Sequence, residues 1–246
     1  MQEKPYQDVF KRVEKKYLLD TSRYTALLKR LEQHMVPDQY GRYAIASLYL
    51  DTDDYHLIRT SLEKPLYKEK LRLRSYGVPD SNSPVFLELK KKYKGVTYKR
   101  RVSLPLWQAE QVMAGKEIEP PAGTQQILQE LIWALKRYHP VPKALVAYDR
   151  TAFSGRKGEE GLRLTLDNAL RWRETALSLS AGDTGVPLLP ADITLMEIKA
   201  PGAMPLWLCH TLSELEIYPV SFSKYGACYR QHLLNQKNTT GGIICA

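Results

Sequence analysis

The stretch 86–102, FLELKKKYKGVTYKRRV, constrains the fold more than any other part of the chain. Seven of its 17 residues are Lys or Arg, and they lie in two extended halves that meet at Lys94-Gly95. Because successive side chains of a strand point to opposite faces, Glu88, Lys90 and Lys92 share one face of the first half. Hydrophobic residues alternate with these charges. The pattern predicts a β-hairpin with a dense row of cations on one side.

The second half of the hairpin carries its cations on both faces. Lys99 and Arg101 share a face with Thr97, whereas Arg100 lies opposite, with Tyr98. The hairpin length does not decide whether Lys99 and Arg101 or their rival Arg100 lie beside the cations of the first half. Directly opposed like charges destabilise a sheet. A face built from cations therefore predicts a polyanionic ligand.

The overall charge leads to the same class of ligand. The 246 residues include 36 Lys and Arg against 27 Asp and Glu, which gives a net charge of +9, and the pI is about 9.3. This balance indicates an anionic partner, such as nucleic acid, a membrane surface or a phosphate-rich small molecule. It does not choose among the three.

The cysteines and the hydropathy pattern bear on location. Cys209, Cys228 and Cys245 are far apart and odd in number, so they match neither a zinc-site spacing nor a disulfide framework. A reducing, intracellular compartment fits best. Neither an apolar signal-peptide region nor a run of about 18 apolar residues is present. We expect a cytoplasmic protein, with peripheral association at the inner face of the membrane left open.

The order of expected elements favours an α+β fold in which helices alternate with strands. Helices are expected after Asp20, over about 53–62, after Pro105, over 124–138, over about 205–215 and in a last turn towards residue 234. The loop 178–191 is rich in Ser, Gly and Pro and is expected to be disordered, as is the tail 236–246. We predict a single domain over residues 1–235. The expected strands lie near 12–19, 43–51, 67–77, the two halves of 86–102, 143–153, 162–172 and 194–199.

At least six of these strands combine a charged face with an apolar face. The outer helices can cover the apolar faces, which leaves the charged faces to point at one another. The fold prediction is therefore an eight-stranded, closed antiparallel β-barrel, a tunnel with a polar, cationic lumen and helices outside. Three acids of these faces, Glu14, Glu88 and Glu197, are suited to a hard divalent cation. The charged sets are Arg12/Glu14/Lys16, Arg72/Arg74, Glu88/Lys90, Lys99/Arg101, Arg150 and Glu197/Lys199.

Eight short motifs in this order resemble a known family, the VTC (vacuolar transporter chaperone) domain. This family is the polyphosphate polymerase branch of the triphosphate tunnel metalloenzyme superfamily. The resemblance extends from about Phe10 to Tyr229. The motifs are FKRVEKKY (10–17), SLYLDT (47–52), LRLRSYG (71–77), LELK (87–90) with KRR (99–101), AYDRTAF (147–153), LRLTLD (162–167), MEIK (196–199) and FSKY (222–225).

The resemblance implies a role for each matching residue. Arg72, Arg74, Lys90 and Arg150 would be the catalytic cations, and Glu197 would carry Mn²⁺ or Mg²⁺. Glu14 and Glu88 would support the metal or pair with cations. Arg12 replaces the first acid of the Glu-x-Glu-x-Lys motif found in the wider superfamily, which suits a phosphate acceptor better than an activated water. The phosphates of nucleotide or product would contact Lys16, Arg72, Arg74, Lys90, Lys99, Arg101, Tyr148, Arg150, Lys199, Ser223 and Lys224.

The implied activity is transfer of the γ-phosphoryl group of ATP to a growing polyphosphate chain. ATP, inorganic polyphosphate and pyrophosphate or triphosphate are the expected ligands, and a separate membrane protein is a candidate partner. Two alternatives are a tunnel triphosphatase and a polyphosphate-binding module without turnover. Nucleic acid is not expected, because no helix-turn-helix, OB or RRM pattern occurs. The blander alternative for Arg72, Arg74 and 90–92 is a solvated basic face, and Glu197 with Lys199 could form an ordinary ion pair.

Overall fold

The structure is a computed structural model that describes residues 12–94 and 96–233. Its secondary structure follows the predicted order closely. The strands of the described chain are β1 (Arg12–Leu19), β2 (Met35–Asp51), β3 (Tyr67–Tyr76), β4 (Pro84–Tyr93), β5 (Val96–Pro105), β6 (Val141–Gly155), β7 (Arg163–Arg173), β8 (Val186–Pro187) and β9 (Thr194–Pro201). The helices are α1 (Thr21–His34), α2 (His56–Leu62), α3 (Leu106–Met113), α4 (Gln125–Tyr138), α5 (Leu206–Glu214), α6 (Lys224–Cys228) and the π-helical turn η1 (Tyr229–Leu233).

The strands form one largely antiparallel sheet. Backbone hydrogen bonds join them in the order β1-β9-β7-β6-β2-β3-β4-β5, and β8 pairs with β7. The predicted α+β class and antiparallel sheet are confirmed. Over the described residues the hydrogen-bonded path ends at β1 and β5, without backbone pairing between these two strands. The predicted tail 236–246 lies outside the described residues.

The chain forms two compact units, and the strands β2, β6 and β7 contribute a segment to each. Unit 1 comprises the described residues up to Tyr43 together with Asp149–Ala169 and Leu189–Phe222. Unit 2 comprises Ala44–Tyr148, Leu170–Leu188 and the described residues from Ser223 onwards. The single domain over residues 1–235 stays a prediction.

The core of unit 1 packs helices α1 and α5 against β1, β7 and β9. Helix α1 begins where the sequence predicts, because the Asp20 carboxylate accepts a hydrogen bond from the backbone N–H of Arg23, 2.8 Å away. This bond and one from the Ser22 hydroxyl lower the pKa of Asp20 to about 2. The helix then buries Leu27 and Leu31. Partners in the same core include Tyr17, Leu19, Leu164, Leu166, Met196, Ile198 and Leu208.

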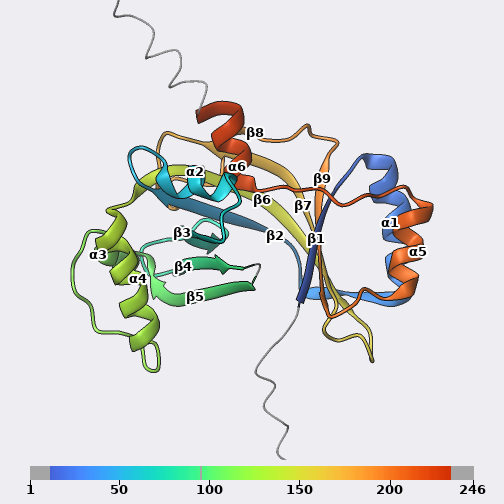
Figure 1. Ribbon diagram of the computed structural model, residues 1–246, viewed down its shortest axis with the longest axis horizontal. Helices are drawn as coiled ribbons and strands as arrows, with labels where there is room; N and C mark the ends of the chain where they lie inside the picture. Colours follow the sequence, from blue (N-terminus) through green and yellow to red (C-terminus); the bar gives the residue numbers. More distant parts are fainter. Residues whose placement is uncertain (1–11, 95, 234–246) are drawn as a thin grey trace, which may run out of the picture. The chain divides into compact units, whose positions relative to one another are not determined.

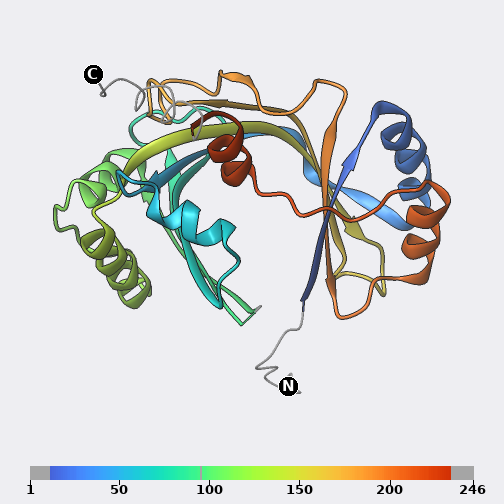
Figure 2. The same ribbon diagram turned by 45° about the horizontal axis from the view of Figure 1, so that its top comes forward.

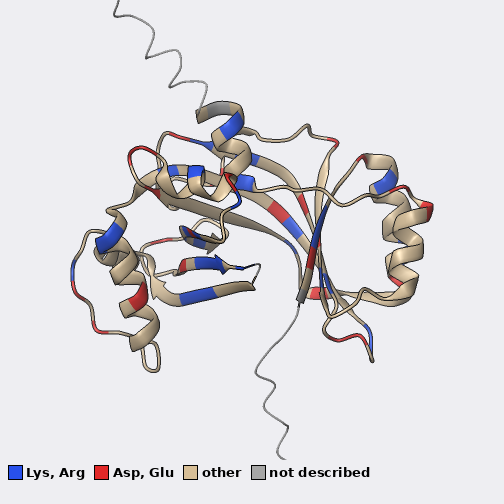
Figure 3. Cartoon of the chain, viewed as in Figure 1, with Lys and Arg blue, Asp and Glu red and all other residues tan. Residues whose placement is uncertain are grey.

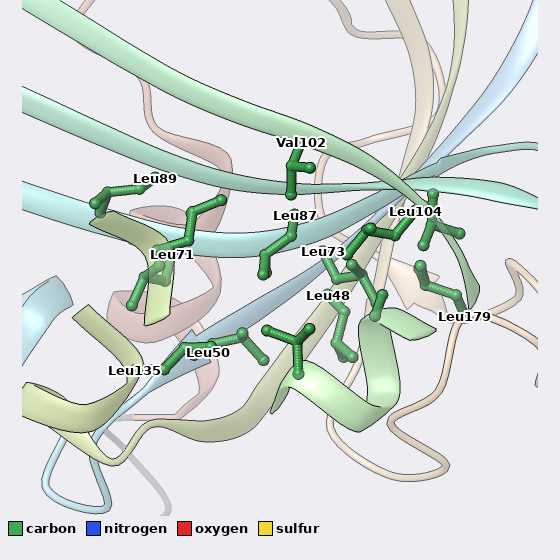
Figure 4. Packing of buried hydrophobic residues seen from close by; sticks show 14 of the residues in the cluster. Leu48, Leu50, Leu71, Leu73, Leu87, Leu89, Val102, Leu104, Leu135 and Leu179 are labelled. Carbon is green, nitrogen blue, oxygen red and sulfur yellow. The ribbon is translucent and has the colours of Figure 1, made fainter. Parts of the chain in front are cut away.

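The core of unit 2 lies between the sheet and helices α3 and α4. Leucines from β2, β3, β4 and β5 form one cluster with Leu135 of α4 and Leu179 (Figure 4). Helix α4 buries Leu128, Leu131 and Leu135 at the predicted helical spacing. Figure 1 shows α3 and α4 together beside β3, β4 and β5. One face of these three strands is thereby removed from water over most of its length.

The three-stranded meander β3–β4–β5 fixes which side chains share a face. Tyr67 of β3 lies opposite Tyr93 of β4, and Tyr93 lies opposite Val96 of β5. Because side chains alternate, this register gives the meander two distinct faces. The apolar face carries the leucines that pack on α3 and α4. We call the other side the charged face, and its members are Lys68, Lys70, Arg72, Arg74, Phe86, Glu88, Lys90, Lys92, Thr97, Lys99, Arg101 and Ser103.

The loop expected to be disordered is instead held by two arginines of β7 within unit 2. Arg171 donates from Nε to the backbone oxygen of Asp183, 2.6 Å away, and also pairs with its carboxylate at 2.5 Å. Arg173 donates to the backbone oxygens of Ala176, Ser178 and Thr184. These hydrogen bonds provide donors for backbone carbonyls of the loop, which the amino-acid composition of the loop did not predict. The expectation of disorder over 178–191 was wrong for this reason.

Candidate functional site

The charged face of the meander in unit 2 gathers most of the cations expected to bind phosphate. Its strands set Lys70, Lys90 and Lys99 directly opposite one another in one row. The next row holds Arg72, Glu88 and Arg101. Figure 3 shows Lys and Arg marked in blue along these strands. A single carboxylate thus lies among at least five cations.

Glu88 is the centre of this group, and its carboxylate binds three cations at once. Arg72 donates from Nε to Oε2 over 2.7 Å, and Arg101 donates from Nε to Oε1 over 2.6 Å. The Lys99 ammonium lies 2.7 Å from Oε1. The Glu88 side chain is 1% exposed, while its partners retain partial contact with water. Three cations against one carboxylate leave a local excess of two positive charges.

The electrostatics of Glu88 follow from this crowding. Burial alone would raise the pKa of the Glu88 carboxyl, but the charges of Arg72 and Arg74 and the bond from Lys99 outweigh it. The pKa of Glu88 therefore lies well below its usual range, and the group is ionised at neutral pH. Burial lowers the pKa of Lys99, and the nearby Arg101 and Arg72 charges lower it further against the opposing pull of Glu88. An incoming anion would relieve that repulsion.

The register also settles which arginine of the KRR motif belongs to the charged face. The Arg101 guanidinium lies 4.0 Å from the centre of the Phe86 ring and donates to the Tyr76 hydroxyl over 3.3 Å. Arg100 lies on the opposite face, where its Nε is 3.0 Å from both carboxylate oxygens of Glu130 in α4. Lys99 and Arg101, not Arg100, therefore accompany Glu88.

Arg74 and Tyr148 form a second, more buried part of the group. Arg74 donates to the Ser47 hydroxyl over 3.1 Å and to the Tyr148 hydroxyl over 3.3 Å. The Lys224 ammonium lies 4.2 Å from the centre of the Tyr148 ring. Arg74 is 8% exposed and Tyr148 is 1% exposed. Such burial fixes the Arg74 guanidinium in one orientation, which suits recognition of a rigid oxyanion.

Ser223 contributes a hydroxyl with both acceptor positions in use. Its Oγ accepts from the Lys70 ammonium at 2.9 Å and from the backbone N–H of Gly226 at 3.2 Å, the latter as the N-cap of α6. A hydroxyl that accepts two hydrogen bonds retains its own proton for donation. Ser223 can therefore donate this proton to a phosphate oxygen.

A buried anchor that sequence reasoning did not identify holds Ser223 and Lys224 in place. The next residue, Tyr225, stacks on Tyr49 with ring centres 4.6 Å apart. Its hydroxyl donates to the carboxylate of fully buried Asp51 over 3.0 Å. Burial raises the pKa of Asp51, although this bond and backbone donors from α2 oppose the rise. The two residues are 174 positions apart, so no local sequence signal could reveal the contact.

Unit 1 contains the candidate metal ligand, Glu197, on β9. The register places it directly opposite Lys16 of β1 and Thr165 of β7. Its carboxylate lies 2.7 Å from the Lys199 ammonium and 3.8 Å from that of Lys16. Lys16 also donates to the backbone oxygen of Phe222 over 2.9 Å. The negative charge of Glu197 is therefore partly screened by cations, and its side chain is 15% exposed.

The surroundings of Glu197 suit a metal only if the substrate supplies further oxygens. Across the described residues, no group of three or more His, Cys, Asp or Glu side chains could hold an ion. Mg²⁺ is commonly held by one or two carboxylates together with substrate phosphates. The buried Thr165 hydroxyl opposite Glu197 lacks a hydrogen-bond partner within the described chain. A hydrated divalent cation at Glu197 would give the Thr165 hydroxyl a hydrogen-bond partner. The residues around Glu197 therefore fit a bound divalent metal ion.

Arg150, also in unit 1, is bound by an acid that sequence reasoning did not assign to the site. Its Nε and Nη2 donate to the two carboxylate oxygens of Asp167 over 2.6 and 2.8 Å. The Asp167 side chain is 1% exposed and that of Arg150 is 15% exposed. This bidentate pair uses two of the five donors of the guanidinium. Glu14 is exposed and lies opposite Lys199 in register, and the Arg12 side chain lies outside the described residues.

The fold and the charged face define an α+β protein built on an antiparallel sheet that concentrates cations around buried carboxylates. The family model for the VTC domain matches residues 11–233. The chain therefore belongs to the VTC domain family, as its motifs predict. Comparison with curated proteins gave no match. In the described chain, none of the helices has the length and apolar character needed to cross a membrane.

The chain is similar to several solved structures at low sequence identity. A candidate adenylate cyclase from Bacillus halodurans superposes with a TM-score of 0.52 at 15% identity, over 86% of this chain and 93% of that chain. A candidate adenylyl cyclase from Hippeastrum, described as having a dominant triphosphatase activity, gives a TM-score of 0.48 at 18% identity, over 89% and 95% of the two chains. A candidate adenylate cyclase from Vibrio parahaemolyticus gives 0.47 at 12% identity, over 90% and 98%. The first of these establishes a shared fold.

Proposed function

We propose that the protein is a polyphosphate polymerase that transfers the γ-phosphoryl group of ATP to the end of an inorganic polyphosphate chain. Membership of the VTC domain family supports an enzyme of the triphosphate tunnel class that acts on phosphoanhydrides. The observation that carries the proposal is the charged face of unit 2, where Arg72, Lys99 and Arg101 share one buried carboxylate. This excess of positive charge is suited to a ligand with several closely spaced negative charges.

The proposal assigns phosphate binding in unit 2 to side chains with different properties. Arg72, Arg74 and Arg101 would hold non-bridging oxygens by directed hydrogen bonds. Lys90 and Lys99 would act as point charges in the same row. Such contacts between cations and phosphate oxygens are the same for every phosphate unit, so they can repeat along a polyphosphate chain. Tyr148, Ser223 and Lys224 would complete the set with two hydroxyls and an ammonium group.

In unit 1, the proposal assigns phosphate contacts to Lys16, Arg150 and Lys199, and Mn²⁺ or Mg²⁺ to Glu197. Such a metal would supply positive charge that stabilises the negative charge developing on phosphate oxygens during transfer. The Glu197 carboxylate would exchange its 2.7 Å contact with Lys199 for the metal, which frees the Lys199 ammonium for phosphate. Asp167 would position Arg150 without contacting substrate. Glu14 and Glu88 would act as supporting acids.

The reaction needs no nucleophilic side chain. A terminal oxygen of the polyphosphate chain attacks the γ-phosphorus of ATP, and the bond from that phosphorus to the β,γ-bridging oxygen breaks. ADP leaves with the bonding electrons, and the chain grows by one phosphate. Because phosphoryl transfer passes through a loose transition state, positioning and charge stabilisation supply most of the catalysis. The cations named above would supply both.

The proposal also covers location and partners. We place the activity in the cytoplasm, at or near the inner face of a membrane, with a separate membrane protein receiving the product. ATP, polyphosphate and pyrophosphate or triphosphate are the proposed ligands, and nucleic acid is not among them. The local charge excess around Glu88, rather than the net charge of the whole chain, is the reason to favour compact polyphosphates.

Product analysis tests this function directly. Purified protein is incubated with ATP and Mn²⁺, polymer is resolved on a gel, and ADP and orthophosphate are quantified. The proposal predicts chains that lengthen with time and ADP equal to the phosphate incorporated. Orthophosphate without polymer would identify a triphosphatase, and tight polyphosphate binding without turnover would identify a binding module. Arg101→Ala should abolish most polymer synthesis, whereas the neighbouring Arg100→Ala serves as the matched control.

A further inference from the structure

The apolar face of the meander changes character at its turn end, beyond the cover of helix α3. Helix α3 follows directly on β5 at Pro105, so the turn between β4 and β5 lies at the other end of these strands (Figure 2). Large apolar and aromatic side chains there are 45% to 70% exposed. We call this group the aromatic patch, and its members are Leu66, Tyr67, Tyr93, Val96, Tyr98 and Trp133.

The register makes the aromatic patch contiguous. Tyr67 lies directly opposite Tyr93, and Tyr93 lies directly opposite Val96. The backbone N–H of Lys94 donates to the carbonyl of Leu66 over 2.9 Å, which ties the start of β3 to the turn. Tyr67, Tyr93, Val96 and Tyr98 lie on the face opposite to the charged face. Their exposed fractions, from 45% to 54%, are therefore not explained by phosphate binding.

Helix α4 extends the aromatic patch from the side. Glu130, Trp133 and Arg137 recur at helical spacing and share one face of α4. The Arg137 guanidinium lies 5.1 Å from the centre of the Trp133 ring and 5.5 Å from that of Tyr138. Tyr138 in turn donates to the buried carboxylate of Glu69 over 2.5 Å. Glu69 also accepts a hydrogen bond from the Tyr67 hydroxyl, which links α4 to the patch.

Cations border the aromatic patch, and nearby acids are already paired. The Lys94 ammonium lies 5.5 Å from the centre of the Tyr93 ring. Lys91 lies directly opposite Tyr98 and shares Glu130 with Arg100. Arg137 adds a fourth cation. Glu130 and the Glu69 carboxylate offset two of these four charges, so the border of the patch keeps a positive excess.

We infer that the aromatic patch docks on the surface of an anionic lipid bilayer. Tyr and Trp suit the bilayer interface because an apolar ring and a polar group share one side chain. Lys and Arg can lay their stems on apolar surroundings while their charges reach lipid phosphates. A second copy of this chain would instead bring a second set of cations against the first. Charge complementarity therefore favours the membrane over self-association.

Vesicle binding by the full chain tests the inference. Sedimentation is measured at about 0.15 M salt with vesicles of equimolar phosphatidylserine and phosphatidylcholine, and with vesicles of phosphatidylcholine alone. The wild-type chain should bind the anionic vesicles and not the neutral ones. Tyr93→Ser/Tyr98→Ser should weaken this binding at least about tenfold. The control Tyr40→Ser/Tyr218→Ser removes two tyrosines of unit 1 that are more exposed than Tyr93 and Tyr98, and it should leave binding unchanged.

Two further measurements separate docking on a membrane from binding through the charged face and from self-association. Excess tripolyphosphate should leave vesicle binding largely intact, since the aromatic patch and the charged face are opposite faces of the same strands. Full release by tripolyphosphate, or equal binding by both double variants, would overturn the inference. So would a wild-type dimer in sedimentation velocity that Tyr93→Ser/Tyr98→Ser converts to a monomer. Turnover of ATP in solution should be the same in the wild type and Tyr93→Ser/Tyr98→Ser, so failure here leaves the proposed phosphoryl transfer untouched.

Discussion

Replacing Glu88 with Gln isolates the contribution of the single carboxylate at the centre of the charged face. The side chain keeps its size but loses its charge, and Arg72, Lys99 and Arg101 lose a partner at 2.6–2.7 Å. A hydrogen bond to a charged group contributes about 1.5–3 kcal/mol. Because these cations are 21%, 43% and 32% exposed, water replaces part of the loss. We expect a total destabilisation of about 2–3 kcal/mol.

The same substitution should strengthen binding of a polyanion. It raises the local excess from two positive charges to three, because the Glu88 carboxylate that pairs with the three cations becomes neutral. We expect tripolyphosphate to bind about tenfold more tightly, which corresponds to about 1.4 kcal/mol. Without ligand, Glu88→Gln should lower Tm by about 5–10 °C. With saturating tripolyphosphate, Tm should rise by about 3–5 °C more in the variant than in the wild type.

Differential scanning fluorimetry with and without tripolyphosphate measures both effects in one experiment. Glu130→Gln is the matched control, because Glu130 also pairs with two cations, Lys91 and Arg100, but on the opposite face. Its response to tripolyphosphate should equal that of the wild type. A response of Glu88→Gln that is equal to or smaller than that of the wild type would refute the view that Glu88 restrains cations meant for phosphate.

Three further perturbations probe the buried acids. The pKa of Glu88 is lower in the folded than in the unfolded chain, so the stability that its charge contributes is complete above about pH 4.3 and is lost as pH falls. Urea unfolding between pH 7 and pH 3.5 should therefore show a steeper loss of stability in the wild type than in Glu88→Gln. Parallel stability curves for the two proteins would contradict this. Arg150→Ala removes the bidentate partner of the buried Asp167 carboxylate and should cost about 3 kcal/mol in the free energy of unfolding. Adding Asp167→Asn should restore part of this loss, and additive losses in the double variant would contradict the pairing. Tyr225→Phe removes the hydroxyl that donates to Asp51 and should lower the free energy of unfolding by about 1–2 kcal/mol. It should also lower the affinity for tripolyphosphate, as measured by calorimetry. Unchanged affinity would mean that the contact between Tyr225 and Asp51 does not position the phosphate-binding residues.

The sequence pattern predicted which charged residues share one face of a strand, because the alternation of side chains along a strand is a local property. The charged sets on β3, β4 and β5 share faces as expected. The choice between Arg100 and Arg101 needed the register across the turn. That register depends on a tight connection in which Lys94 adopts a positive φ of 46°. A non-glycine residue in this conformation is uncommon, and the sequence did not indicate it.

Partners distant in the sequence were the part that could not be predicted. Asp167 was recognised as a strand residue, but its bidentate bond to Arg150 depends on how β6 and β7 approach each other. Asp51 ends the strand expected over 43–51, but its carboxylate accepts hydrogen bonds from the first turn of α2 and from the distant Tyr225. The loop 178–191 was misjudged because its composition was considered without the donors of Arg171 and Arg173. Each case reflects a long-range or side-chain contact that local propensity does not encode.

The central claim is that the charged face of the meander, and not its opposite face, binds phosphate. Calorimetric titration of tripolyphosphate into two double variants of equal net charge tests it most directly. Lys90→Ala/Arg101→Ala removes two cations from the charged face, and Lys91→Ala/Arg100→Ala removes their immediate neighbours from the other face. We predict that the first pair weakens binding at least about tenfold and that the second leaves it unchanged. Equal weakening by both pairs would contradict the claim, because binding would then follow net charge alone.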